Sequence, residues 1–488
     1  MRGFAPAIAV VAVACGGVAA AEPAAKKPNV LFIAVDDLKP AIFAAGDPHA
    51  KTPNIDALAG RGTVFRRAYC QQAVCSPSRS SLLTGRRPDS TKVYDLVTHF
   101  RKTLPDVVTL PQHFKKNGYH VQGVGKIYHP GYNDEPSWSV PWEATKGKGY
   151  GPDGQKLLVK LKAEQKKEDE IRVRGLAFEA PEVDDDTLND GWTANRAIDI
   201  LKNRKGKQEP FFLAVGFAKP HLPFVAPKKY WDLYDPDKLP VAMSSDPPRD
   251  APKFGPQNGG ELRAYHQMPK SGPLPMDTQR KLVHGYYAAV SYMDAQLGRV
   301  LEALKEQGLT ENTVVILWGD HGWHLGDHGM WCKHTNYEQA TRAALLMSVP
   351  GQKVTGKRCE GLVEFVDIYP TLAEVCGLPK SDGVEGHSFA PLLDDPAKKW
   401  KAAAFSQYPR APGQPTGPLM GYAIRTDRYR YVEWRKKGTT EVVARELYDH
   451  TTDPAEDTNV AADPANKAVL EELARKLSDG WQKNTPPK

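Results

Sequence analysis

The side chains best placed to do chemistry in this sequence lie in a short motif around Cys75. The motif reads Cys-Ser-Pro-Ser-Arg from Cys75 to Arg79 and continues through small residues to Leu-Thr-Gly-Arg, which ends at Arg86. The alternative interpretation is a structural cysteine in front of a helix that Ser76 or Ser78 caps. Five residues alone do not decide between the two, so partners elsewhere in the chain must.

Two pairs of polar residues each follow an apolar run. Asp36 and Asp37 come directly after one run, and Asp320 and His321 follow another. Adjacent carboxylates at the end of a buried strand repel each other unless a cation lies between them. Three carboxylates favour a hard divalent ion, calcium or magnesium. Imidazole is a softer ligand, so His321 either binds the ion or supports its ligands.

Basic side chains also follow apolar runs. Lys126 and His129 lie just beyond one predicted strand, His221 lies just beyond another, and Lys333 follows the loop after His321. A single lysine or histidine is most often a solvated surface residue. Their repeated position after strands favours a shared site. Three more histidines are interpreted as loop or substrate-facing residues without an assigned role: His324, His328 and His334.

The elements that must position these residues alternate between strand and helix patterns. Unbroken apolar runs predict buried strands at 29–35, 119–124, 211–217 and 314–318, and helix patterns cover 52–59 and 108–117. This alternation predicts a doubly wound α/β fold with a mostly parallel sheet flanked by helices, in which functional groups gather at the carboxyl ends of the strands. The lysine- and glutamate-rich segment 146–179 is expected to be an exposed insertion.

The pattern changes near residue 394. Short strands are expected at 421–427, 429–434 and 446–449, and an amphipathic helix at 466–477. We therefore predict a leader at 1–21, a larger α/β domain at 22–393 and a smaller C-terminal α+β subdomain at 394–488.

The first 21 residues are typical of an export signal: Arg2, an apolar run too short to span a bilayer, and a small-residue cleavage site. The protein is expected to be secreted or periplasmic. Lipid anchoring at Cys15 is the less favoured alternative, and no other segment is apolar enough to span a membrane. The net charge of +7 suits an acidic polymer as substrate. The sequence has no basic stripe interleaved with aromatic residues, so nucleic acid is not the expected partner.

Six cysteines are present, and loss of the leader removes Cys15 and leaves an odd number. This favours one thiol with a separate task, at Cys75, and leaves four that can form up to two disulfides. Cys359 and Cys376 are one conceivable pair, and the state of Cys332 stays open.

Taken together and in this order, the motifs resemble those of the type I sulfatases, which belong to the alkaline phosphatase superfamily. They are most similar to the motifs of the iduronate-2-sulfatase subgroup, and the chain resembles a bacterial member of it. Two details favour this subgroup over arylsulfatases: the Asp-His pair at Asp320 and His321, where arylsulfatases usually have Asp-Asn, and the Lys-Pro-His-Leu-Pro-Phe segment from Lys219 to Phe224.

The resemblance implies that Cys75 is oxidised to formylglycine by a maturation enzyme and that the hydrate of this aldehyde attacks sulfur. It implies that one calcium ion is held by Asp36, Asp37, Asp320, His321 and residue 75. By the same resemblance Arg79 orients the hydrate, and the sulfate is surrounded by Lys126, His129, His221 and Lys333. The implied substrate is a sulfated carbohydrate, such as a 2-O-sulfated uronate.

Two alternatives stay open. One is a phosphatase or phosphonate monoester hydrolase on the same scaffold, although such relatives often bind two metals and use serine or threonine as nucleophile. The other is a non-catalytic glycan-binding protein, which would follow if Cys75 were never oxidised.

Overall fold

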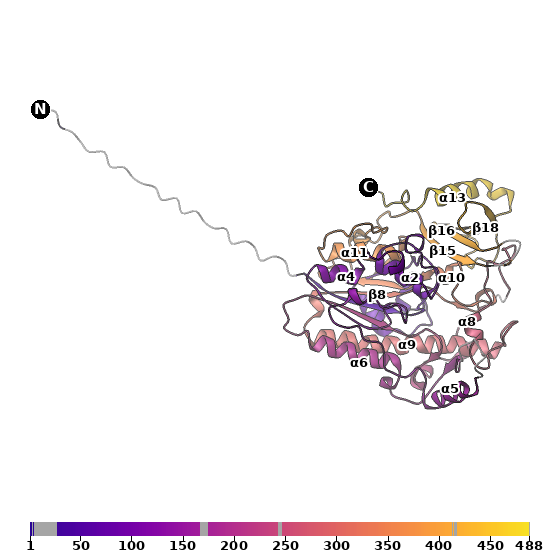
Figure 1. Ribbon diagram of the computed structural model, residues 1–488, viewed down its shortest axis with the longest axis horizontal. Coiled ribbons are helices and arrows are strands. Elements are labelled where there is room, and N and C mark those ends of the chain that lie inside the picture. Colours follow the sequence, from indigo (N-terminus) through magenta and orange to yellow (C-terminus); the bar gives the residue numbers. More distant parts are fainter. Residues whose placement is uncertain are drawn as a thin grey trace.

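The computed structural model of the protein (Figure 1) describes residues 1, 3, 27–165, 174–242, 246–411, 413 and 417–487. The predicted export signal lies almost entirely outside the described residues, and so does Cys15. Among the helices of the described residues, none is long and apolar enough to cross a bilayer.

A mostly parallel sheet forms the centre of the molecule. Within the described residues it has seven strands in the order β13-β2-β12-β8-β1-β6-β4. The strand β12 is antiparallel to both of its neighbours, and the other pairs are parallel. The strands are β13 (Lys357–Cys359), β2 (Thr63–Phe65), β12 (Leu345–Ser348), β8 (Thr313–Gly319), β1 (Asn29–Val35), β6 (Phe211–Phe217) and β4 (His120–Gly125). The predicted fold class is confirmed.

Helices cover both faces of this sheet (Figure 1). The helices α6 (Asn189–Lys202) and α9 (Met276–Glu306) lie on one face. The helices α2 (Cys75–Thr84), α4 (Leu110–Lys116) and α11 (Ile368–Val375) lie on the other. Residues of β1 alternate between the two cores: Leu31 packs with the α9 side and Phe32 with the α2 side. A strand buried on both faces needs apolar residues at every position, which is why its sequence is an unbroken apolar run.

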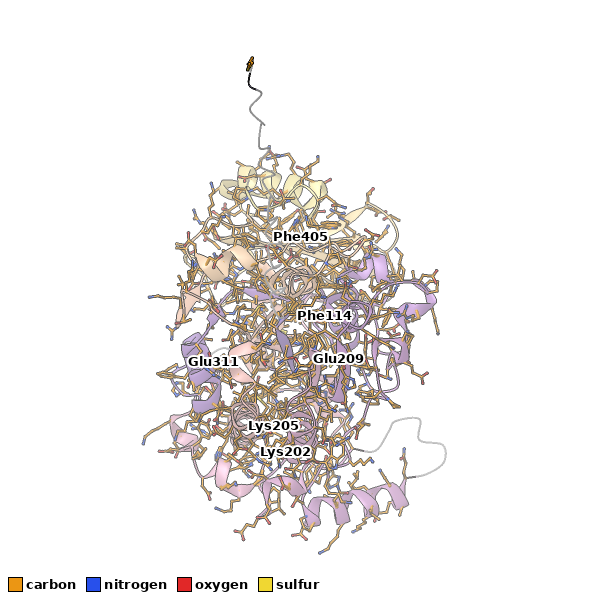
Figure 2. All side chains as sticks on the ribbon, turned by 90° about the vertical axis from the view of Figure 1, so that its left-hand side faces the viewer. Phe114, Lys202, Lys205, Glu209, Glu311 and Phe405 are labelled. Carbon is orange, nitrogen blue, oxygen red and sulfur yellow. The ribbon has the colours of Figure 1, made fainter. Side chains whose placement is uncertain are left out.

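Side chains fill the space between the layers (Figure 2). Phe114 of α4 lies in this interior, with its ring centroid 4.8 Å from that of Phe212 on β6. The shorter elements are α1 (Pro53–Gly60), α3 (Pro88–Thr91), α7 (Lys228–Trp231), α8 (Gly260–Arg263), α10 (Glu338–Thr341), α12 (Ala390–Asp394), β3 (Ala68–Tyr69), β9 (His324–Leu325), β10 (Trp331–Cys332), β11 (Arg342–Ala343) and β14 (Val363–Glu364).

A second sheet forms the C-terminal part of the chain. Its strands β15 (Ala404–Arg410), β16 (Leu419–Arg425), β17 (Tyr429–Lys436) and β18 (Val442–Asp449) pair antiparallel in sequence order. The helix α13 (Lys467–Asp479) packs on it through Leu473 and Leu477, which contact a core that includes Ile424. The sequence predicted the last three strands and the helix, but not β15.

The segment 146–179 was expected to be an exposed insertion, but its described part is folded and partly buried. It contains the helix α5 (Pro152–Glu164) and the strand β5 (Phe178–Glu179), which pairs with β7 (Phe224–Val225). Tyr150 and Ala177 are buried in it, so the described part of the segment packs on the domain. The exposed lysines of α5 include Lys156 and Lys160, with 80% and 71% of their side chains exposed.

All five cysteines in the described part of the chain are free and buried. Cys359 and Cys376, considered as a pair from the sequence, are therefore not bonded to each other. Cys332 is also free.

Candidate active site

The carboxylates that follow β1 and β8 meet at one edge of the central sheet. β1 and β8 are parallel neighbours, with Val35 opposite Gly319, so the residues after them emerge side by side. The backbone N–H of Asp37 donates to Asp320 Oδ1 over 2.9 Å. Asp36, Asp37 and Asp320 are all buried. The edge thus gathers three carboxylates that water does not solvate.

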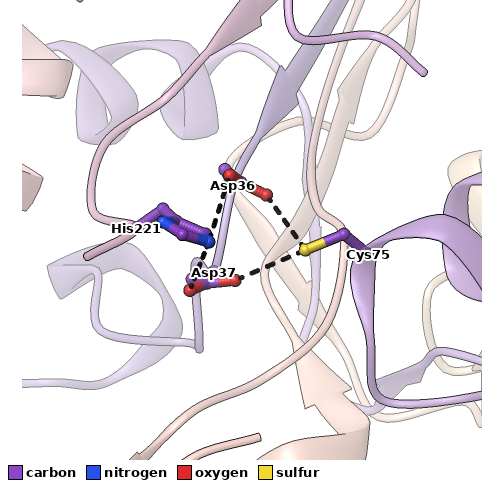
Figure 3. A group of neighbouring side chains, drawn as sticks. All are labelled: Asp36, Asp37, Cys75 and His221. Atoms are coloured by element: carbon purple, nitrogen blue, oxygen red, sulfur yellow. Dashed lines mark hydrogen bonds and ion pairs between the residues drawn. The ribbon is translucent and has the colours of Figure 1, made fainter. Parts of the chain in front are cut away.

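Cys75 is the first residue of α2 and points at these carboxylates (Figure 3). Its Sγ lies 3.6 Å from Asp36 Oδ1, 4.0 Å from Asp37 Oδ1 and 3.4 Å from His321 Nε2. Burial raises the pKa of the Cys75 thiol well above its ordinary value, and Lys126 only partly opposes this. An unmodified Cys75 is therefore a protonated thiol, which is a poor nucleophile.

Arg79 lies beneath this cluster with its side chain only 1% exposed. Its Nη2 is 3.1 Å from Asp36 Oδ1 and its Nε is 2.9 Å from Asp320 Oδ2. A further N–H donates to the carbonyl of Ile127 over 2.9 Å. The guanidinium therefore locks two strand ends and the segment after β4 into one geometry.

Lys126 reaches the cluster because β4 and β6 approach each other closely at their ends. A Cβ on Gly216 would meet the Lys126 backbone at 2.3 Å, and Gly125 has a φ of +76°. Glycine is the residue that tolerates both conditions. The Lys126 ammonium pairs with Asp36 and lies 3.7 Å from Cys75 Sγ.

His221 and Lys333 approach Asp37 from another side. Both also contact Glu261, a carboxylate that the sequence did not indicate. His221 Nε2 lies 3.8 Å from Asp37 Oδ2, and Lys333 Nζ lies 3.1 Å from the same oxygen. Glu261, at the start of α8, contacts both, at 3.3 Å from His221 Nε2 and 2.8 Å from Lys333 Nζ. Figure 3 shows His221 and Cys75 on opposite sides of Asp36 and Asp37.

A cavity of about 460 Å³ opens over these groups. Cys75, Lys126, His129, His221 and Lys333 line it. It is also lined by residues from segment 146–179, from α8 and from just after α8: Tyr150, Leu158, Lys162, Arg174, Gly175, Glu261 and Tyr265. The structure thus brings every sequence-predicted site residue to one cavity or to the wall directly beneath it.

His129 is a neutral base at the edge of this cavity. Burial and then the Lys126 charge lower the pKa of His129 to about 4. Its Nδ1 is buried and has no hydrogen-bond partner among the described residues. The ring is therefore unprotonated at neutral pH, and one of its nitrogens presents a lone pair.

The three histidines without an assigned role differ from this group. His324 Nε2 lies 2.9 Å from Thr335 Oγ1, and His328 Nε2 lies 2.9 Å from the carbonyl of Ala455. The His334 ring packs edge-on near Tyr408, with centroids 6.0 Å apart. None of these three lines the cavity over Cys75 in the part of the chain that the structure describes.

The donor set at the sheet edge fits a divalent cation. His321 Nδ1 lies 2.9 Å from the carbonyl of Gly322, so this nitrogen carries the proton and Nε2 presents a lone pair. The Nε2 atom lies 3.2 Å from Asp37 Oδ1 and 3.6 Å from Asp320 Oδ1. Electron-rich atoms this close and buried need a proton or a cation between them. One ligand atom from each of Asp37, Cys75, Asp320 and His321 lies within 4.8 Å of the others.

Comparison with known families agrees with this chemistry. Residues 28–378 match the sulfatase family model, and residues 326–483 match the model of the N-sulphoglucosamine sulphohydrolase C-terminal region. The chain is 35% identical to the iduronate 2-sulfatase of Mus musculus, over 91% of this chain and 93% of that protein. It is 33% identical to a sulfatase of Formosa agariphila, over 92% of this chain and 85% of that protein.

Solved structures share the fold. A phosphonate monoester hydrolase from Silicibacter pomeroyi superposes with a TM-score of 0.76 at 25% identity, over 94% of this chain and 96% of that one. A protein solved in complex with D-glucosamine-2-N,6-O-disulfate superposes with a TM-score of 0.73 at 21% identity, over 94% of this chain and 99% of the other. The predicted resemblance is confirmed: the chain belongs to the sulfatase family and is a sulfuric ester hydrolase.

Proposed function

We propose that this enzyme removes the sulfate of a sulfated carbohydrate, most specifically the 2-O-sulfate of a uronate, after export from the cell. The observation that carries this proposal is the position of Cys75, whose Sγ lies among Asp36, His321 and Lys126 on the floor of the cavity. The similarity to iduronate 2-sulfatase over most of both chains supports the substrate class. The typical leader at 1–21 supports export.

We assign the nucleophile to residue 75 after its oxidation to formylglycine by a maturation enzyme. The buried thiol is held in its protonated form, so the encoded side chain is unsuited to attack. When present, the hydrated aldehyde supplies two hydroxyl groups on one carbon, one to attack sulfur and one through which sulfate is later released. Buried Arg79 holds the first turn of α2 in register with Asp36 and Asp320, and so fixes where residue 75 points.

One calcium ion is proposed at the sheet edge, held by Asp36, Asp37, Asp320, His321 and residue 75. Three carboxylates favour calcium over softer metals, and the Nε2 lone pair of His321 completes the set. Such an ion supplies positive charge against the sulfate oxygens.

The remaining residues act on charge and protons. Lys126 and Lys333 line the cavity and neutralise the anionic substrate, whose oxygens otherwise repel a nucleophile. His221 or Lys333 protonates the departing alcohol, because an alkoxide leaves poorly. Neutral His129 takes the proton whose removal releases sulfate.

The alternative of a phosphonate monoester hydrolase keeps one supporting observation, the shared fold with the Silicibacter pomeroyi enzyme. A panel of matched esters tests the proposal. Purified protein is assayed for inorganic sulfate or phosphate release from defined 2-O-sulfated, 6-O-sulfated and N-sulfated saccharides, an aryl phosphate and a phosphonate monoester. We expect release to be fastest from the 2-O-sulfated uronate. Turnover of phosphorus esters alone would contradict the proposal.

A further inference from the structure

The cavity over Cys75 contains an arginine that the mechanism above does not use. Arg174 lies on the wall of the cavity that Lys126 and Lys333 also line. Its side chain is 33% exposed, so it is neither fully buried nor freely solvated. It belongs to segment 146–179, outside the central sheet.

The position of Arg174 is fixed by contacts with the segment around α8. Its backbone forms a parallel bridge with Tyr265, and the N–H of His266 donates to the carbonyl of Gly175 over 2.9 Å. The guanidinium lies over the Tyr265 ring, 5.0 Å from the centroid. An arginine stacked on an aromatic face loses little freedom when it binds a further group.

The charge of Arg174 is only partly balanced. Its Nη1 lies 3.6 Å from Glu261 Oε1, and this is its carboxylate partner among the described residues. Glu261 is shared, because the same side chain also contacts Lys333 and His221. One carboxylate therefore faces three basic side chains, so the charge of Arg174 is left able to pair with a second anion.

We propose that Arg174 determines specificity by binding the carboxylate of the sulfated sugar while Lys126 and Lys333 hold the sulfate. This inference deepens the proposed function and rests on it. A guanidinium presents paired N–H donors that match the two oxygens of a carboxylate. Arg174 is separated from Lys333 by Glu261 alone, which places a second anion-binding group beside the first in one cavity. A substrate with two negative groups on one ring, a sulfated uronate, satisfies both.

The proposal is tested with two substrates that differ only in the carboxylate. One is an aryl uronide 2-sulfate, and the other is its carboxyl-reduced counterpart, an aryl hexoside 2-sulfate. Sulfate release is measured for the wild type, Arg174→Ala and Arg174→Lys. Loss of a charged hydrogen bond lowers kcat/KM of Arg174→Ala on the uronide by roughly 10- to 150-fold. On the hexoside, kcat/KM of Arg174→Ala stays within about threefold of the wild type. On the uronide, kcat/KM of Arg174→Lys lies between those of the wild type and Arg174→Ala, because lysine keeps the charge but lacks the planar guanidinium.

Lys160→Ala is the matched control, because Lys160 lies on α5 of the same segment with 71% of its side chain exposed and does not line the cavity. It removes the same charge away from the substrate, so its loss on the uronide is expected to be within about threefold. Equal losses on both substrates for Arg174→Ala would mean a purely structural role and would overturn the inference. A wild type that desulfates the hexoside as well as the uronide would also overturn it, while leaving the sulfatase function intact. Absence of sulfate release from every substrate by protein oxidised at residue 75 would overturn both.

Discussion

Buried Arg79 shows how a single residue holds the site together. It faces Asp36 and Asp320 and also donates to a backbone carbonyl. Lysine retains the charge but has no planar fork, so it cannot keep both carboxylates paired. We predict that Arg79→Lys lowers the free energy of unfolding by about 1.5–3 kcal/mol, the cost of leaving one charged hydrogen bond unmade.

Urea denaturation measures this change. Arg428→Lys is the control, because Arg428 pairs with Asp449 on the surface with 54% of its side chain exposed. Its effect should be clearly smaller than that of Arg79→Lys, because solvent screens the exposed pair. Equal effects of the two substitutions would show that Arg79 does not bind the strand ends together as described.

At this scale the sequence predicted the residues that follow strands and missed those on irregular segments. Asp36, Asp320 and Lys126 stand directly after apolar runs, and the geometry of a parallel sheet brings such positions together. Glu261 and Arg174 carry no such signal. Glu261 lies on the four-residue helix α8, and Arg174 lies in the charged segment 146–179. Only the packing of these two segments against each other places both side chains in the cavity.

Among the elements, the junction between β14 and the start of the C-terminal sheet depends on a buried ion cluster. Lys401 Nζ lies 2.6 Å from Glu364 Oε2 and 2.5 Å from Asp367 Oδ2, and these side chains are at most 1% exposed. Arg87 also pairs with Glu364. Removing one partner from a buried ion pair leaves an uncompensated charge.

We therefore predict that Lys401→Met lowers the free energy of unfolding by about 3–5 kcal/mol. The exposed Lys398, three residues earlier, provides the control Lys398→Met, with a change within about 0.5 kcal/mol. Chemical denaturation at pH 7 checks both. A loss under about 1 kcal/mol for Lys401→Met would contradict a structural role for the cluster.

The same cluster predicts a pH dependence. Burial alone would raise the pKa of Glu364, but Arg87 and Lys401 override it and hold this pKa below its ordinary value. A carboxyl whose pKa is lower in the folded state stabilises the fold at pH values above its pKa in the unfolded state, about 4.3. This stability is lost as the pH falls toward the pKa of the folded state. The gap in unfolding free energy between the wild type and Lys401→Met should therefore narrow as the pH falls below about 4.3. A gap that stays constant or widens would contradict this linkage.

Several elements were not predicted from the sequence, and α9 and β15 illustrate two different reasons. The helix α9 carries a readable period, with Leu282, Tyr286, Val290, Met293 and Leu297 buried at spacings of three and four. The strand β15 contains Pro409 and the polar residues Ser406 and Gln407, which weaken a strand pattern in the sequence. It is recognisable only through its pairing with β16.

In the whole molecule, the proposed calcium would link segments that are far apart in the sequence. A cation held by residues after β1 and β8 and by α2 binds the folded chain and not the unfolded one. We predict that calcium at 100 times its Kd raises the free energy of unfolding by about 2.7 kcal/mol and that a chelator reverses this. Differential scanning calorimetry detects the accompanying rise in Tm.

Asp37→Asn should abolish this calcium-dependent rise, whereas Asp153→Asn, at a side chain 91% exposed, should preserve it. Calcium that stabilises the Asp37→Asn protein as strongly as the wild type would place the ion elsewhere.

The proposed function requires that oxidised residue 75 performs the reaction. The most direct measurement is the rate of sulfate release from a 2-O-sulfated uronate, plotted against the fraction of protein converted at this position. Conversion removes sulfur and two hydrogens and adds one oxygen, a loss of about 18 Da that peptide mass spectrometry resolves. We predict a rate proportional to the converted fraction, with none for Cys75→Ala. Sulfate release by unconverted protein, or by Cys75→Ala, would show that residue 75 is not the nucleophile.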